Sequence, residues 1–179
     1  MTELPDPAIY SRVKLLIAPF LLVSTVAMSG SVAVNAGPAT NPCEGDAGMT
    51  FEDWKEWTLV TPKAVLSQGH GSSWVKIHVN ELAESTYLSA GAPYPQCAKV
   101  VKSHYFDAEG TQIDSLTVMV KMPSGYDTEN GDWWYGMYDK SGTIAKKQGR
   151  LFTACIACHK QAAKTDYLFS EEVLNEAHE

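Results

Sequence analysis

CAKVVKSHYFDAEGTQIDSLTVMVKM, residues 97–122, carries the clearest fold signal in this chain of 179 residues. Apolar and polar side chains alternate over about 97–106 and again over 115–122, which is the period of two expected of half-buried strands. Between these segments, Asp107-Ala108-Glu109-Gly110 supplies the turn residues of a hairpin. The stretch therefore predicts two antiparallel strands that lie side by side.

The segments outside this hairpin extend the same architecture. They are a short amphipathic helix at 51–57, a strand at 74–79, a helix at about 81–88, a strand at 133–138 and a helical period from 151 onward. Asn80 is placed to cap the helix that follows it. We therefore predict an α+β fold, a predominantly antiparallel β-sheet with packed helices and a C-terminal helix.

Residues 1–36 differ in composition from the rest of the chain. Arg12 and Lys14 precede an uncharged run rich in Leu, Val and Ala that ends in small residues. This is the layout of a secretory signal peptide, with cleavage expected after Ala36. The run is also about as long as a membrane span, roughly 20 residues, so an uncleaved N-terminal anchor is the competing interpretation.

After the signal segment we expect a linker, 37–50, and one domain, 51–179. Export would place this domain in the periplasm, an oxidising compartment where disulfides persist. The chain carries 21 acidic and 14 basic residues, a formal charge of −7, and has no basic stripe. A nucleic-acid partner is therefore not expected.

Cys155-Ile156-Ala157-Cys158-His159 has the pattern C-x-x-C-H, which is typical of covalent attachment of haem c. Two thiols three residues apart on one helical turn can each form a thioether to a haem vinyl group, and the adjacent histidine can bind the iron. A redox dithiol would favour a βαβ context, and a zinc site would need a second ligand pair. Neither is found, so one covalent haem c with its iron is the predicted cofactor.

The motif lies late in the chain. Only 20 residues follow His159 and none is methionine. Met119, Met122 and Met137 lie upstream on predicted strands, where packing is the more usual role. We therefore expect five-coordinate iron with one open face, which suits binding or chemistry at the metal. A six-coordinate electron carrier, completed by Met or Lys, remains an alternative.

Several short motifs, taken in order, resemble the cytochrome P-460 family, which includes cytochrome c′-beta. Four-helix cytochromes c′ also carry a late haem motif, but residues 74–138 alternate like strands. The matching stretches are Trp54–Trp57, Val75–Asn80, Ala98–Lys102, Val118–Lys121, Gly125–Asp127, Glu129–Trp133, Cys155–Lys160 and Thr165–Asp166. They span most of the predicted mature chain.

This resemblance implies a mostly antiparallel sheet, usually a homodimer, around one five-coordinate haem. Members of the P-460 branch carry a lysine bonded to the porphyrin and oxidise hydroxylamine, whereas the beta branch binds nitric oxide and carbon monoxide. Lys102, at the end of Val100-Val101-Lys102, matches that lysine. The leading interpretation is an enzyme that oxidises hydroxylamine and passes electrons to a soluble cytochrome. A gas-binding protein without turnover is the alternative.

Strand alternation places Lys102 on one face together with Ala98, Val100 and His104. A lysine among small apolar side chains would be desolvated, which lowers its pKa and leaves a nucleophilic amine. An ordinary solvated lysine is the competing interpretation.

Other polar residues are weaker candidates. The resemblance implies that Arg150 lies near the open haem face, where it could donate hydrogen bonds to a bound ligand, and a surface arginine before the helix is the more ordinary expectation. His70 and His104 are candidate proton acceptors if they reach the pocket, although loop or surface positions are the more ordinary expectation.

The remaining cysteines and a run of aromatic residues also carry expectations. Cys43 and Cys97 are left once the haem takes its pair, and a disulfide between them is the simplest outcome in an oxidising compartment, with an exposed thiol as the alternative. In Trp133-Trp134-Tyr135, alternation puts Trp133 and Tyr135 on one face and Trp134 on the other, so one set packs against porphyrin or core.

Overall fold

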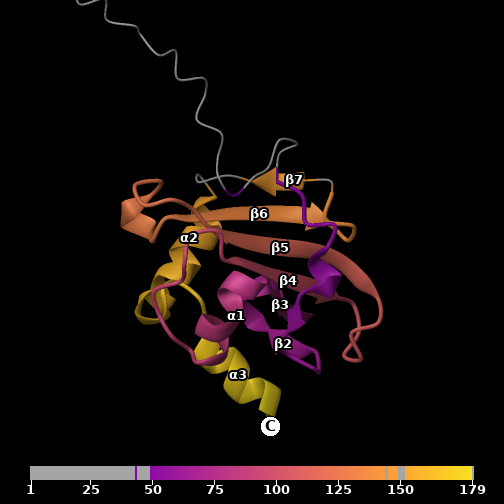
Figure 1. Cartoon of the computed structure of the whole chain (residues 1–179). Helices are drawn as coiled ribbons and strands as arrows, with labels where there is room; N and C mark the ends of the chain where they lie inside the picture. Colours follow the sequence, from indigo (N-terminus) through magenta and orange to yellow (C-terminus); the bar gives the residue numbers. More distant parts are fainter. Residues whose placement is uncertain (1–42, 44–48, 144, 149–151, 179) are drawn as a thin grey trace, which may run out of the picture. The chain divides into compact units, whose positions relative to one another are not determined.

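Seven strands form an antiparallel sheet in the order β1-β3-β4-β5-β6-β7, and β2 also pairs with β3 (Figure 1). This computed structural model describes residue 43 and residues 49–143, 145–148 and 152–178. The predicted signal segment, nearly all of the predicted linker and Arg150 lie outside these residues, so the predictions about them stay predictions. Among the described residues, no helix is long and apolar enough to cross a membrane.

The elements follow the order expected of an α+β chain. The strands are β1 (Thr58–Leu59), β2 (Val65–Ser67), β3 (Ser73–Val79), β4 (Lys99–Tyr105), β5 (Ile113–Lys121), β6 (Trp133–Asp139) and β7 (Ala145–Gln148). The α-helices are α1 (Glu81–Leu88), α2 (Thr153–His159) and α3 (Ser170–His178), and short 3₁₀ helices are η1 (Trp54–Glu56), η2 (Gln68–His70), η3 (Thr128–Asn130) and η4 (Lys160–Thr165). The predicted fold class is confirmed.

The predicted hairpin is the centre of the sheet. β4 pairs with β5 from Lys99 opposite Val120 to His104 opposite Ser115, and the register shifts before Tyr105. β3 lies on the other side of β4, and β6 on the other side of β5. Both hairpin strands are therefore hydrogen-bonded along both edges, and they form the centre of the sheet on which the helices pack.

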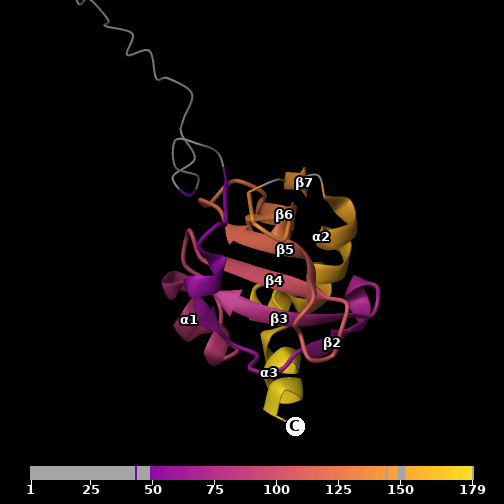
Figure 2. The same ribbon diagram turned by 90° about the vertical axis from the view of Figure 1, so that its right-hand side faces the viewer.

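The two faces of the sheet bury different side chains. All three α-helices pack on one face, which we call the helical face. Its buried residues include Val75, Ile77, Ala83, Tyr87, Val100, Met119, Trp133, Tyr135 and Leu168. Figures 1 and 2 both place α3 and the C-terminus toward the β2 edge of the sheet and β7 at the other edge.

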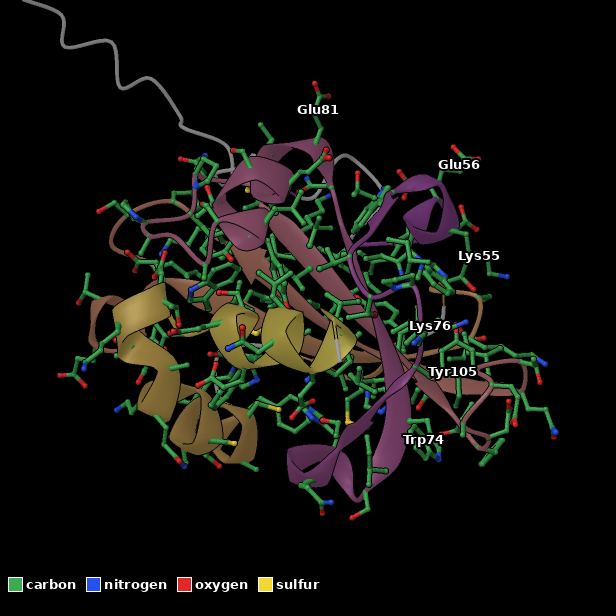
Figure 3. The ribbon with its side chains drawn as sticks, turned by 90° about the horizontal axis from the view of Figure 1, so that it is seen from below. Lys55, Glu56, Trp74, Lys76, Glu81 and Tyr105 are labelled. Carbon is green, nitrogen blue, oxygen red and sulfur yellow. A yellow bond between two sulfur atoms is a disulfide. The ribbon has the colours of Figure 1, made fainter. Side chains whose placement is uncertain are left out.

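The other face, which we call the opposite face, is covered by Cys43 and by residues 49–57, which include η1. Its buried residues include Phe51, Trp54, Val101, Leu116, Val118, Val120, Trp134 and Tyr138. Toward β3 this face becomes polar and partly exposed: Trp74 pairs with Tyr105, and the Lys76 amine lies 5.3 Å from the centre of the Tyr105 ring (Figure 3). The alternation predicted for both β4 and β6 is confirmed.

The segment 51–57 differs from its prediction. In place of an amphipathic α-helix, only Trp54–Glu56 forms a 3₁₀ turn. Phe51 and Trp54 both insert into the opposite face, with 0% and 2% of their surface exposed. The Phe51 N–H donates to the carbonyl of Gly142 at 2.9 Å. Because this bond holds the chain to a distant loop, the local apolar spacing does not develop into a longer helix.

The disulfide and the helix cap expected from the sequence lie together. Cys43 and Cys97 are joined by a disulfide. Asn80 caps α1 by accepting from the N–H of Ala83 at 3.2 Å, and the same side-chain oxygen accepts from the N–H of Lys99 at 2.8 Å. The Asn80 amide also donates to the Cys97 carbonyl at 3.0 Å. One side chain therefore fixes the start of α1 against the start of β4.

Candidate functional site

The C-x-x-C-H motif forms most of α2. Cys155 and Cys158 are partly buried thiols that are not in a disulfide. His159 ends the helix and is only 8% exposed. Because the two cysteines are three residues apart on an α-helix, their side chains lie on the same side, about one turn apart. The motif thus presents two thiols and an imidazole from one short helix.

His159 is held in one orientation. Its Nδ1–H donates to the backbone carbonyl of Tyr167 at 2.6 Å. The rings of Tyr135 and Phe169 flank it, each with a centre 5.5 Å from the imidazole centre. Burial lowers the pKa of His159 to about 4, so the ring is neutral at neutral pH. A hydrogen bond at Nδ1 leaves Nε2 with a lone pair for a metal, as in metal-ligating histidines generally.

The carbonyl that orients His159 is itself fixed from the sheet. Asp166, in the left-handed region at φ 50°, precedes Tyr167. Its carboxylate accepts from the Lys121 amine at 2.6 and 2.7 Å and from the Tyr94 N–H at 2.8 Å. Trp133 Nε1–H donates to the Asp166 carbonyl at 2.8 Å. The loop after the motif is therefore tied to β5 and β6 at the residue next to the orienting carbonyl.

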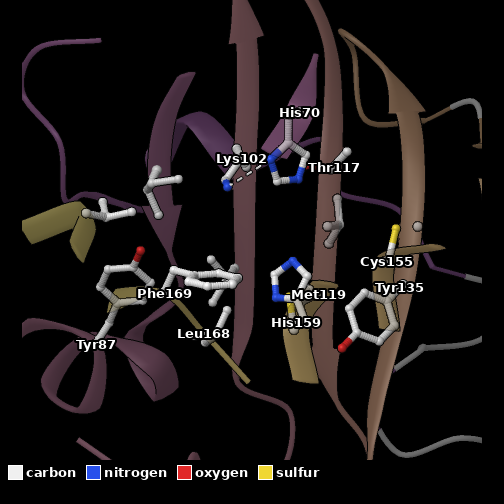
Figure 4. Close-up of a pocket in the computed structure, with 15 residues that line it drawn as sticks. His70, Tyr87, Lys102, Thr117, Met119, Tyr135, Cys155, His159, Leu168 and Phe169 are labelled. Carbon is white, nitrogen blue, oxygen red and sulfur yellow. Dashed lines mark hydrogen bonds between the residues drawn. The ribbon is translucent and has the colours of Figure 1, made fainter. Parts of the chain in front are cut away.

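A pocket opens between α2, α3 and the helical face of the sheet (Figure 4). Most of its lining is apolar: Ile77, Val100, Met119, Leu168, Phe169 and Val173. The polar groups that reach it are His70, Tyr87, Lys102, Thr117, Tyr135 and His159, together with the Cys155 thiol. Cys158 lines an adjoining hollow that shares His70, Lys102 and Phe169 with the first.

Lys102 reaches this pocket from β4, on the face that strand alternation predicts. Its amine lies 3.3 Å from Nδ1 of His70 (Figure 4). Burial lowers the pKa of Lys102 to about 8, while Cys158 and Glu176 act in the other direction. At pH 7 about a tenth of the amine is therefore uncharged, far more than for a lysine with the ordinary pKa, and the interpretation as an ordinary solvated lysine is wrong.

His70 lies on a turn, η2, as the loop expectation had it, yet it reaches the pocket, and the loop or surface position expected for His104 is wrong. His70 lines the pocket, its ring centre is 5.4 Å from that of His104, and burial lowers its pKa to about 3. His104 is 8% exposed and lies between the hydroxyls of Ser73 and Thr117, at 2.9 Å each, with its pKa lowered by burial to about 4. The position of His70 in the pocket could not be predicted from the sequence, because it depends on how the loop that carries His70 folds over the sheet.

The upstream methionines are divided between the two faces. Met119 lines the pocket, whereas Met122 packs on the opposite face. Met137 lines a hollow beside His104. In the aromatic run, the Tyr135 ring packs on His159, and Trp134 lies on the opposite face.

This donor set fits a haem. Two thiols at attachment spacing, an imidazole with Nε2 available and a largely apolar pocket are what a c-type haem requires. A buried polar atom points the same way: among the described residues the Tyr135 hydroxyl has no hydrogen-bond partner, although it is inaccessible to water. Such a group is satisfied when a polar ligand enters the pocket.

These features define a haem protein of the cytochrome class. The sequence profile of the family described as Cytochrome P460 matches residues 51–170, well over half of the chain, and the chain belongs to this family. A search of curated proteins found none that matches. The family membership predicted from the ordered motifs is confirmed, and with it a haem and its iron.

Sequence reasoning missed several residues of the site. Tyr87 comes from α1, and Leu168 and Phe169 come from the loop before α3, all outside the C-x-x-C-H motif. The Thr165-Asp166 step was part of the resemblance, but its role in holding the Tyr167 carbonyl could not be inferred.

Proposed function

We propose that this chain is a periplasmic mono-haem c-type cytochrome that oxidises hydroxylamine and passes the electrons to a soluble cytochrome acceptor. The observation that carries the proposal is the position of Lys102. Its amine, with a pKa lowered to about 8, lies in the same pocket as the C-x-x-C-H imidazole. In this family, members of the hydroxylamine-oxidising branch carry a lysine bonded to the porphyrin at the matching strand position, and the bond, rather than the lysine alone, distinguishes that branch.

Cys155 and Cys158 would attach the haem. In each thioether, sulfur bonds to one vinyl carbon and the thiol hydrogen goes to the other, so the addition is redox-neutral. His159 would bind the iron through Nε2, since Tyr167 already occupies Nδ1. When bound, the haem supplies an iron position for a nitrogen ligand and the couple that accepts its electrons.

Lys102 would form a further covalent bond to the haem, between its side-chain nitrogen and a porphyrin carbon. A nitrogen–carbon bond to the porphyrin replaces one N–H and one C–H, a two-electron oxidation that needs an oxidant such as a peroxide. Only an uncharged amine can attack, and desolvation at Lys102 provides one. His70 holds the amine at 3.3 Å and so fixes the direction of its nitrogen.

Hydroxylamine oxidation releases protons together with electrons, and the pocket contains two titratable nitrogen groups, His70 and Lys102, whose charged forms are disfavoured by burial. Burial lowers the pKa values of His70 and Lys102. Both residues are partly buried, so both can hold a small polar substrate away from bulk water. The product would be an oxidised nitrogen species.

A protein that captures nitric oxide without turnover is the second candidate. The apolar lining formed by Val100, Met119 and Leu168 favours it, because such walls suit a small neutral gas. In that case Lys102 would remain a free amine.

Purified protein distinguishes the two. We expect peptide mapping to recover haem on Cys155 and Cys158 and an adduct at Lys102, with a red-shifted ferrous spectrum and hydroxylamine-dependent reduction of an added cytochrome. Lys102→Met should abolish the adduct and the red shift. Lys99→Met is the matched control, because Lys99 lies on the opposite face with its amine 5.8 Å from the centre of the Phe51 ring. Unmodified Lys102 with no turnover would favour gas capture.

Location and assembly belong to the same proposal. The segment 1–36 supports export, and the homodimer follows from the resemblance. Fractionation of the periplasm, with the mature N-terminus sequenced, tests the first. Sedimentation of the haem-loaded protein tests the second, and a monomer at micromolar concentration would contradict it.

A further inference from the structure

A line of hydrogen-bonded side chains crosses the helical face of the sheet beside the pocket. Thr117 lines the pocket from β5 (Figure 4), and its hydroxyl lies 2.9 Å from Nε2 of His104 on β4. Nδ1 of His104 lies 2.9 Å from the hydroxyl of Ser73 on β3. The line therefore runs over three neighbouring strands, each of which is held in the sheet by its own pairing.

The other end of the line lies at a second opening. Ser73, His104 and Thr117 all line a hollow beside the pocket, together with Phe106 and Asp114. Phe106 is 72% exposed and Asp114 is also exposed, so this hollow reaches the molecular surface. The three side chains therefore connect the interior of the pocket with solvent by a route that does not pass the C-x-x-C-H motif.

One backbone carbonyl fixes the direction of the hydrogen bonds. The Ser73 hydroxyl has one hydrogen, which it donates to the carbonyl of His70 at 3.0 Å, so its oxygen accepts from Nδ1–H of His104. Burial lowers the pKa of His104 to about 4, which keeps the ring neutral at neutral pH. Nε2 then carries no hydrogen and accepts from the Thr117 hydroxyl. Each donor hydrogen in the line therefore points away from the pocket.

This direction suits the transfer of a proton outward. When the Thr117 oxygen accepts a proton from a ligand, its own hydrogen moves to Nε2 of His104, and the Nδ1 hydrogen moves to Ser73. Ser73 then releases its hydrogen to solvent in the hollow. At each atom one bond to hydrogen forms and one breaks, so no electron moves and no charge stays on the buried ring. Imidazole suits this role because one nitrogen accepts while the other donates.

We propose that Thr117, His104 and Ser73 form the path by which a proton leaves a ligand that loses one in the pocket. The proposal deepens the proposed function and rests on it for the ligand, since hydroxylamine oxidation releases protons that must reach solvent. Beyond that it needs only an attached haem with an open iron face. Thr117 would contact the ligand, and His104 and Ser73 are positioning residues that act through it.

Cyanide binding to the ferric protein tests the path without any turnover. Hydrogen cyanide is uncharged at pH 7, and when its carbon bonds to the iron, the hydrogen–carbon bond breaks and the proton must leave the pocket. We expect the rate constant in stopped-flow absorbance to fall about tenfold or more in His104→Gln and in Thr117→Val, because a positioned proton acceptor contributes about a hundredfold or more. Glutamine keeps hydrogen-bonding groups at this position but cannot relay a proton.

Two controls separate proton transfer from a change of shape. Carbon monoxide binding to the ferrous protein moves no proton, so its rate should be unchanged in both variants. His78→Gln is the matched control, because His78 is also a buried histidine, with its ring centre 4.8 Å from that of Trp54, and should leave cyanide binding unchanged. An unchanged cyanide rate in either His104→Gln or Thr117→Val, or an equal fall in carbon monoxide binding, overturns the inference.

The direction of the hydrogen bonds has a test that does not depend on rates. Nitrogen-15 NMR of labelled histidine in the ferrous carbon monoxide complex, which is diamagnetic, should show His104 neutral with its hydrogen on Nδ1. The signal is assigned by its loss in His104→Gln. A hydrogen on Nε2, or a charged ring at neutral pH, overturns the inference.

The two proposals fail differently. Cyanide binding that depends on His104, without hydroxylamine turnover, would refute the proposed enzyme and leave the proton path. Turnover in a protein whose cyanide binding is independent of His104 would do the reverse. A purified chain without haem would refute both.

Discussion

Removing one partner of the ion pair between Lys121 and Asp166 should cost several kcal/mol, because the charge that remains is largely buried and Asp166 supports the loop that orients His159. Lys121 and Asp166 are 14% and 10% exposed, and their closest N···O distance is 2.6 Å. Replacing Asp166 with Asn keeps the side-chain size and suits φ 50°, since asparagine tolerates the left-handed region. It leaves the Lys121 ammonium buried without its counter-charge.

Removing one partner of a buried pair costs about 3–5 kcal/mol, and the amide oxygen that remains places Asp166→Asn near the lower end. We therefore expect the free energy of unfolding to fall by about 3 kcal/mol, with a drop in Tm of about 10 °C. Urea titration of the haem-loaded protein measures the first quantity. Calorimetry measures the second.

The double variant Lys121→Met with Asp166→Asn is the control. If the loss comes from an uncompensated charge, removing both charges should recover the stability to within about 1 kcal/mol of the wild type. A loss below 1 kcal/mol in Asp166→Asn, or a double variant as unstable as the single one, would refute the reasoning. The pair would then be ordinary surface electrostatics.

Three further outcomes are expected. Replacing Cys43 and Cys97 with serine should cost about 4 kcal/mol in urea titrations, from loop closure over 54 residues, and an unchanged midpoint would contradict this. Burial lowers the pKa values of His70, His78 and His104 to about 3–4, below the unfolded value of 6.5. The unfolded state therefore binds more protons, and stability should fall as pH drops from 6.5 toward 4, by up to about 1.4 kcal/mol per histidine per pH unit; a flat profile would contradict it. Gly131→Ala should destabilise by about 1–3 kcal/mol, because φ is +69° and a Cβ would overlap the Tyr167 ring, and a neutral thermal shift would show that the ring moves aside.

Much of the sheet could be predicted because its signals are local. The alternation in β4 and β5, the turn after Phe106 and the cap at Asn80 each depend on residues within one element or its immediate flank. The 51–57 segment was predicted less well, since its conformation depends on a bond to Gly142, about ninety residues away. Long-range contacts of that kind leave no periodicity in the sequence.

In the site, too, the residues with local signals could be predicted and those that depend on long-range contacts could not. The C-x-x-C-H motif fixes its own geometry by helical spacing, and Lys102 follows from strand parity. His70 could not be placed, because its loop is polar and glycine-rich like any exposed turn, and only the pairing of β2 with β3 brings it over the pocket. The role of Asp166 depends on Lys121, which lies 45 residues earlier.

The sheet also separates the four cysteines into two chemical compartments. The disulfide packs on the opposite face, and Cys155 packs on the helical face with its motif partner one turn away. Four thiols permit three pairings, but once the strands have assembled, crossing between the sets would require the sheet to come apart. In the folded protein the sheet therefore keeps the two motif thiols away from the two cysteines of the disulfide.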